Sequence, residues 1–294
     1  EFGDLSIETV QNLAWWQRLL VPTMGGLIVG YFIYKFVPEK RPMGVPQVME
    51  ASALHGANMS LRDGVRGAIA NAATLGFGGS AGREGPVVHL GATIGAKLAR
   101  LGRLPREQAR VLLACGVAGA VAASFNAPLA GVFFALEVVI GHYALAAFAP
   151  IVIASLVATI VSRQIYGEFP AFVIPDYSTS YFEFPAFALL GGAAALLAVT
   201  FMRLVPLVEQ SLAKVPIVPW LRPTIGGFGV GLIALAYPEV LGVGYGATDA
   251  ALKGEMSLLL LLGLLAAKTL ATALTLGSGF GGGVFSPSLS LIHI

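Results

Sequence analysis

Long apolar stretches, interrupted by glycine, proline and short polar segments, set the pattern of this chain. Each of the longest is close to the roughly 20 residues that a helix needs to cross a lipid bilayer. These stretches are residues 19–37, 111–140, 143–161, 184–201, 223–237 and 258–276. Because Gly and Pro interrupt several of them, the pattern predicts an all-α, polytopic membrane protein with broken or re-entrant helices.

Composition agrees with this fold class and excludes others. Hydrophobic residues make up 56% of the chain and charged residues 12%, whereas a soluble domain carries about 25% charged residues. A net charge of +2 is too small to indicate a nucleic-acid partner. The single cysteine, Cys115, lies in an apolar run, so we predict no disulfide framework and no metal cluster. No cofactor is expected.

The polar segments divide the chain into two membrane halves. We expect an N-terminal interfacial segment, a first membrane half, a connecting loop and an incomplete second membrane half, which are residues 1–18, 19–163, 164–182 and 183–294. Trp15 and Trp16 are suited to anchor the first segment at the membrane surface. The second half is expected to be incomplete because it ends before it reaches a counterpart of the Pro-centred break near Asn126.

A glycine-rich loop, residues 76–85, leads into a helix that we expect to start near Glu84 or Gly85. Pro86 suits the first helical turn, where its missing N–H group would have no partner in any case. The free N–H groups and partial positive charge of a helix start favour an anion. A second loop of this kind, residues 277–287, occurs in the second half. Two such loops fit an internal repeat whose broken helices meet inside the membrane.

Four motifs, taken together and in their order along the chain, resemble those of the CLC family of chloride channels and chloride/proton antiporters. Residues 82–86 match its GREGP motif, and residues 277–287 resemble its GSGxxGGxFxP motif. Residues 44–46 resemble the end of its GSGIP motif, and residues 126–131 are typical of the family. The resemblance implies inverted repeats and transport of small anions, mainly chloride, by a homodimer in which each subunit has its own pore.

The same resemblance implies roles for single residues. Glu84 matches the gating glutamate, whose carboxylate occupies an anion site and swings out to let anions pass. Arg83 would raise the potential at the outer entrance. The residues that match the anion-binding segments are Gly85, Val284, Phe285, Met43, Gly44 and Val45. The protein is expected to be an integral, multi-pass protein of the lipid bilayer, in a bacterial inner membrane, with no enzymatic activity.

Three departures from the family pattern bear on mechanism. The anion-coordinating serine of the family is replaced by Met43, which has no hydroxyl group. The proton-transfer glutamate of the antiporters is replaced by Val138, with Glu137 adjacent. The tyrosine of the central site falls beyond Ile294. Valine cannot carry a proton, so the sequence favours a passive, glutamate-gated channel over a chloride/proton antiporter.

Two further alternatives stay open. A fluoride-selective exchanger is compatible with Met43, although the ordinary segment 284–287 counts against it. A remote alternative is an intramembrane serine hydrolase, because residues 78–82 fit the G-x-S-x-G pattern with Ser80 as nucleophile. That chemistry needs a base within hydrogen-bond reach. The histidines that could serve are His55, His89, His142 and His293.

Overall fold

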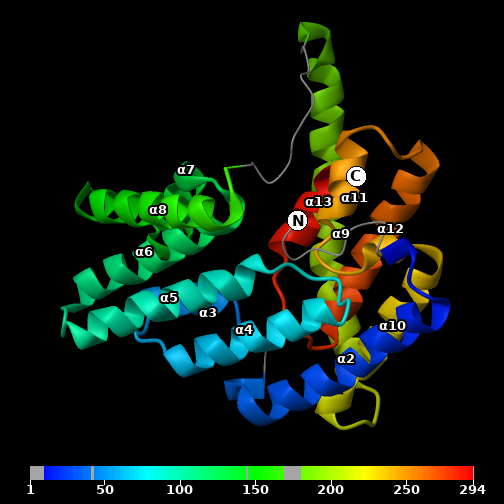
Figure 1. Ribbon diagram of the computed structural model, residues 1–294, viewed down its shortest axis with the longest axis horizontal. Helices are drawn as coiled ribbons and strands as arrows, with labels where there is room; N and C mark the ends of the chain where they lie inside the picture. The colour runs from blue at the N-terminus through cyan, green and yellow to red at the C-terminus, as the bar shows by residue number, and fades with distance from the viewer. Residues whose placement is uncertain (1–9, 41–42, 144, 169–179, 294) are drawn as a thin grey trace.

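The computed structural model describes residues 10–40, 43–143, 145–168 and 180–293, and it is built from helices (Figure 1). The first half contains α2 (Trp15–Phe36), α3 (Val45–Ala53), α4 (Leu61–Gly76), α5 (Glu84–Leu101), α6 (Arg106–Phe125), α7 (Pro128–Phe134), the π-helical turn η2 (Ala135–Ile140) and α8 (Leu145–Tyr166). The second half contains α9 (Phe184–Ala213), α10 (Arg222–Ala236), α11 (Tyr245–Leu252), α12 (Leu258–Gly277) and α13 (Phe285–His293). The predicted all-α class is confirmed.

Five of the described helical segments are long and apolar enough to cross a membrane. They are α2, α6, α8, α12 and the segment Tyr181–Ala213, which includes α9. Two of the predicted stretches need correction. Residues 223–237 form most of α10, which has 15 residues and is shorter than a full span. Residues 111–140 are not continuous, because Asn126 adopts a left-handed φ of 53° and ends α6 before α7 begins at Pro128.

The segment boundaries follow the sequence closely in the described ranges. α2 begins at Trp15, and its first two residues are 69% and 49% exposed, which suits an interfacial position. α8 continues to Tyr166, slightly into the expected connecting loop. Most of that loop, residues 169–179, and residues 1–9 lie outside the described ranges, so the division into four segments stays a prediction.

Close packing of small residues holds the first half together. A Cβ atom on Gly116 of α6 would lie 2.0 Å from the carbonyl oxygen of Gly91 in α5, so a larger residue would force the two helices apart. The buried cluster around this contact includes Leu113, Leu136 and Ile151, which come from α6, η2 and α8. The α5–α6 pair therefore forms a rigid support for the start of α5.

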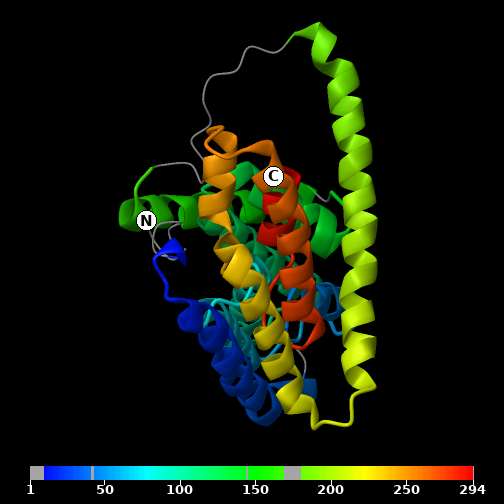
Figure 2. The same cartoon turned by 90° about the vertical axis from the view of Figure 1, so that its right-hand side faces the viewer.

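The two halves meet along α2 and α10, which pack side by side over much of their lengths. α9 stands at the edge of the molecule (Figure 2). Phe201 is the one residue of α9 classed as buried among the described residues, and the helix exposes many large apolar side chains. Such a surface is suited to lipid rather than water.

Candidate functional site

The two predicted glycine loops meet through their backbones. The N–H group of Gly82 donates to the carbonyl of Gly283, and the N–H group of Gly283 donates to the carbonyl of Gly82, both at 2.7 Å. A Cβ atom on Gly85 would lie 3.1 Å from the Cα atom of Gly283. The glycines therefore allow an approach that larger residues would block, and they bring the starts of α5 and α13 together.

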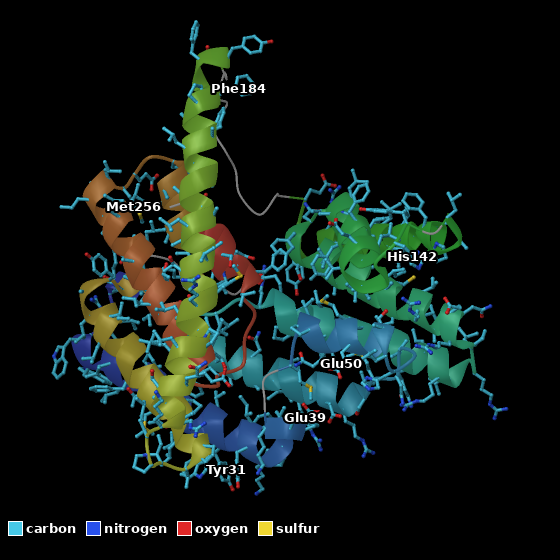
Figure 3. All side chains as sticks on the ribbon, turned by 180° about the vertical axis from the view of Figure 1, so that it is seen from behind. Tyr31, Glu39, Glu50, His142, Phe184 and Met256 are labelled. Carbon is cyan, nitrogen blue, oxygen red and sulfur yellow. The ribbon has the colours of Figure 1, made fainter. Side chains whose placement is uncertain are left out.

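Ser80, the central residue of the first loop, adds two bonds to the second half. Its N–H group donates to Thr275 Oγ1 at 3.1 Å, and its hydroxyl lies 3.0 Å from Thr272 Oγ1. These bonds tie the loop to α12 and occupy the hydroxyl that the hydrolase hypothesis needs. His55 and His142 are exposed, and His142 lies at the outer edge of the first half (Figure 3). The described contacts of Ser80 therefore give it a structural role.

A cavity of about 520 Å³ lies beside the paired loops. All of the residues predicted to bind the anion line it: Met43, Gly44, Val45, Gly85, Val284 and Phe285. The first N–H groups of a helix have no partner within the helix. Because α5 begins at Glu84 and α13 at Phe285, two helix starts bring partial positive charge to this cavity.

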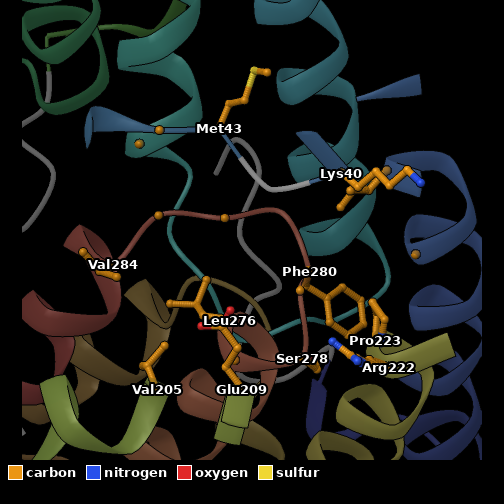
Figure 4. Close-up of a pocket in the computed structure, with 18 of the residues that line it drawn as sticks. Lys40, Met43, Val205, Glu209, Arg222, Pro223, Leu276, Ser278, Phe280 and Val284 are labelled. Carbon is orange, nitrogen blue, oxygen red and sulfur yellow. The ribbon is translucent and has the colours of Figure 1, made fainter. Parts of the chain in front are cut away.

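Charged side chains also line this cavity. Glu209 and Arg222 lie on the opposite side from Met43 (Figure 4). Lys40 also contributes to the lining, and Arg222 Nε is buried without a hydrogen-bond partner in the described part of the chain. The lining of the cavity therefore contains side chains of both charges as well as the glycine-rich backbone segments.

The segment around Met43 provides fewer groups for anion binding than the sequence predicts. The Met43 side chain packs against a buried cluster that includes Ile33 and Phe280, and it points away from Val284 in Figure 4. The N–H group of Gly44 donates to Gln47 Oε1 at 2.8 Å. That bond caps the start of α3, so the Gly44 amide is engaged within its own segment.

Glu84 is buried rather than part of an exposed ion pair. Its side chain is 3% exposed, and Arg83 Nε lies 3.8 Å from Glu84 Oε1. The same oxygen accepts a hydrogen bond from the Tyr245 hydroxyl at 2.8 Å and another from the Ser286 hydroxyl. The other oxygen, Oε2, is buried and has no hydrogen-bond partner among the described residues. In the ranges that the structure describes, the Glu84 carboxylate is therefore hydrogen-bonded through one oxygen only, and both donors are side chains of the second half.

Val138 and Glu137 lie apart from this centre. Both belong to η2, a π-helical turn in which the N–H group of Gly141 donates to the carbonyl of Leu136. Val138 is partly buried and Glu137 is exposed. Neither residue belongs to the described lining of the cavity. Their predicted relation to proton transfer therefore stays a hypothesis.

Sequence reasoning overlooked three polar residues that organise the site: Tyr245, Ser286 and Lys268. Tyr245 starts α11 and follows a third glycine run, residues 242–244, which could have drawn attention to it. Lys268 lies within the apolar helix α12 and is 2% exposed. A charged residue inside a membrane helix is a functional candidate by default, so this signal was also present in the sequence.

The fold defines a polytopic membrane protein in which interrupted helices meet at a buried carboxylate. Residues 25–291 match the family model Voltage_CLC, described as "Voltage gated chloride channel". The chain belongs to this family of anion transport proteins, which confirms the resemblance seen in its motifs.

Individual relatives agree with this assignment. The chain is 33% identical to the "Putative chloride channel protein ClcB-like" of Ralstonia nicotianae, covering 96% of this chain and 67% of the relative. It is 31% identical to the "Voltage-gated ClC-type chloride channel ClcB" of Escherichia coli O17:K52:H18, covering 96% of this chain and 68% of the relative. It is 34% identical to "Chloride channel protein CLC-f" of Arabidopsis thaliana, of which it covers 38%. The chain therefore spans about two thirds of these bacterial relatives.

Solved structures share the fold. A CLC-type fluoride/proton antiporter superposes with a TM-score of 0.80 and 26% identity, covering 93% of this chain and 69% of that chain. A slow cyanobacterial Cl⁻/H⁺ antiporter superposes with a TM-score of 0.82 and 24% identity, covering 95% of this chain and 67% of that chain.

Proposed function

We propose that this protein carries chloride across a membrane in exchange for protons, with Glu84 as the group that both ions share. An anion would approach through the cavity beside the paired loops and bind at the starts of α5 and α13. Backbone N–H groups and helix dipoles bind an anion loosely enough for it to leave again, which transport requires. Arg83, which is about one third exposed, would raise the potential at the outer entrance.

One observation carries this proposal: a buried carboxylate lies where the two helix starts meet, and hydroxyl groups hold it there. An ionised carboxylate and a chloride ion compete for the same donors, so one must leave before the other binds. A displaced carboxylate is free to take up a proton. Exchange of the two ions then follows from competition for one position.

The comparisons support exchange over the passive channel that Val138 favours. The fluoride/proton antiporter with 26% identity is a proton-coupled member of the same fold. The curated bacterial relatives are named as chloride channels, so their names support the anion and leave the coupling open. Passive conduction remains the second candidate, because Val138 cannot carry a proton and Glu137 beside it is exposed.

The quaternary state and location are part of the same proposal. Resemblance to the family supports a homodimer in which each subunit has its own pathway. The bacterial relatives support a bacterial inner membrane as its location. Glu84, Arg83 and the residues predicted to bind the anion would then act within one subunit.

The proposal is tested by measuring chloride flux and pH at the same time in proteoliposomes that contain the full-length protein. We expect an outward chloride gradient to drive protons inward against their own gradient. Chloride flux without any proton movement would contradict exchange and support the passive channel. Repeating the measurement with fluoride tests the anion, since a large preference for fluoride over chloride would contradict the chloride assignment.

A further inference from the structure

Two hydroxyl groups, from α11 and α13, converge on one carboxylate oxygen of Glu84 at the start of α5. Tyr245 of α11 and Ser286 of α13 both donate to Glu84 Oε1, and their own hydroxyl oxygens lie 3.0 Å apart. All three side chains are partly or fully withdrawn from solvent. We refer to the two hydroxyl groups of Tyr245 and Ser286 as the hydroxyl pair.

The surrounding structure fixes the hydroxyl pair independently of Glu84. Lys268 of α12 donates to the carbonyls of Val240 at 3.0 Å and Gly242 at 2.9 Å, which holds the loop that leads into α11. Gly244 has a φ of +100° and packs against the Lys268 side chain, where a Cβ atom would lie 3.1 Å from Lys268 Nζ. The backbone just before Tyr245 is therefore tied down by a buried cation.

A second tie joins α11 to α13. The Thr248 hydroxyl donates to Ser290 Oγ at 3.0 Å, one turn beyond each member of the hydroxyl pair. This bond lies between the two helices that carry Tyr245 and Ser286. The pair would therefore keep its position when the Glu84 carboxylate moves away.

The Glu84 carboxylate has fewer hydrogen bonds from the described residues than it could accept. Glu84 Oε1 accepts both hydroxyl bonds, whereas the buried Oε2 has no hydrogen-bond partner in the described ranges. Oε2 faces the backbone at Gly82, where a Cβ atom would lie 2.7 Å from it. Since a buried polar atom without a partner costs free energy, the closed position of Glu84 is easier to leave than a fully bonded one.

The hydroxyl pair also supplies what the first half lacks. Met43 has no hydroxyl group, and the Gly44 amide is engaged by Gln47. A hydroxyl group is a hydrogen-bond donor, so it can bind either a carboxylate oxygen or a halide ion. Once Glu84 leaves, the hydroxyl pair loses the acceptor that Oε1 supplies, and an anion in its place would restore that bonding.

We propose that the hydroxyl pair of Tyr245 and Ser286 is an anion receptor that Glu84 and the transported anion occupy in turn. The inference rests on the proposed function, because it assigns the ligands of the position over which chloride and Glu84 compete. In this chain the hydroxyl ligands of the anion would come from the second half, because Met43 replaces the serine that the family pattern places in the first half.

The test compares chloride binding in two backgrounds by isothermal titration calorimetry on the purified full-length protein. In the Glu84→Ala background no carboxylate competes, so Tyr245→Phe or Ser286→Ala should weaken chloride binding by about tenfold, as expected for one lost hydrogen bond to an ion. With Glu84 present, the same changes weaken chloride and its competitor together. The apparent affinity should then change by less than about twofold.

Matched variants separate this receptor from a general effect on folding. Ser288→Ala removes a hydroxyl from α13 that donates to the Val284 carbonyl, and Tyr181→Phe removes an exposed phenol. Both should leave chloride binding unchanged in either background. Ser286→Thr keeps the hydroxyl group and should retain the affinity that Ser286→Ala loses.

Two results would overturn the inference: unchanged chloride binding in the Glu84→Ala background, or an equal loss in both backgrounds. Failure of Ser286→Thr to retain affinity would also count against it. The proposed function fails separately, because proton movement is measured in proteoliposomes. If proton movement were absent while the variants still weakened chloride binding only in the Glu84→Ala background, the exchange hypothesis would fail and the anion receptor would stand.

Discussion

The two glycine loops have the same plan but supply different chemistry. Each runs through glycines into a helix start, and the loops pair through Gly82 and Gly283. The first loop delivers charge, since Arg83 and Glu84 are adjacent at the start of α5. The second delivers neutral donors, since Ser286 is its polar side chain at the start of α13. The first half therefore provides Glu84, which competes with the anion, and the second half provides the hydroxyl pair that binds either of them.

This division explains why neither loop forms a site alone. A carboxylate beside a helix start is stabilised by the dipole, yet Glu84 takes its side-chain bonds from Tyr245 and Ser286 across the interface between the halves. Changes in the first loop should therefore alter gating, whereas changes in the second loop should alter affinity. Changes at the backbone bridge should disturb both properties.

The largest effect is expected from Gly283→Ala. A Cβ atom at this position would lie 2.8 Å from the Gly85 amide nitrogen, so the loops would have to separate. We expect anion flux to fall by about a hundredfold or more, because both helix starts move away from the cavity. Gly191→Ala in α9 is the control, since nothing lies within 4 Å of its Cβ position. Normal flux through Gly283→Ala would show that the bridge is dispensable.

A smaller effect is expected from Met43→Ser, which returns a hydroxyl group to the first half. The Met43 side chain packs against a buried cluster, so the serine would leave space there and could turn toward the cavity. We expect the chloride to nitrate selectivity ratio to change by a few fold, in keeping with one added hydrogen bond. Flux under bi-ionic conditions measures this ratio, with Met43→Leu as the apolar control. Identical ratios in both variants would exclude Met43 from selectivity.

A still smaller effect is expected from Val138→Glu. This position matches the antiporter proton glutamate, but Val138 does not line the described cavity. We therefore expect the proton to chloride ratio of the wild-type protein to persist, as judged from reversal potentials. Val138→Leu is the control for packing within η2. A reversal potential that follows the proton gradient more closely than in the wild type would show that a proton route passes through position 138.

The smallest effect is expected from Ser80→Ala. Its hydroxyl lies 3.0 Å from Thr272 Oγ1, so removing it costs about 1 kcal/mol of stability and no transport function. Thermal unfolding in detergent measures the stability, and flux measures the function. A fluorophosphonate probe should not label the protein. Covalent labelling that Ser80→Ala abolishes would revive the hydrolase hypothesis.

Much of the fold could be predicted because its signals are local. Apolar length predicts the long helices, and Pro86 and the glycines before it predict the start of α5. The break at Asn126 was visible as a Pro-centred interruption, although its left-handed backbone was not. The bounds of α10 were predicted to within one residue, but its 15 residues are fewer than a full membrane span needs.

The site was only half predictable for a physical reason. The residues predicted to bind the anion belong to motifs that can be recognised one loop at a time. Tyr245 and Lys268 act through contacts between elements far apart in the chain, such as the 161-residue separation between Tyr245 and Glu84. The engagement of the Gly44 amide by Gln47 depends on a side-chain conformation that spacing does not specify. Long-range contacts of these kinds need coordinates.

The most direct test of the account is chloride flux as a function of pH for the wild type and for Glu84→Gln, with proton movement recorded together. Protonation neutralises the Glu84 carboxylate and frees the hydroxyl pair, so wild-type flux should rise as pH falls. Glu84→Gln should keep chloride flux but lose both its pH dependence and proton movement. Unchanged pH dependence in Glu84→Gln would contradict the claim that Glu84 is the group for which proton and anion compete.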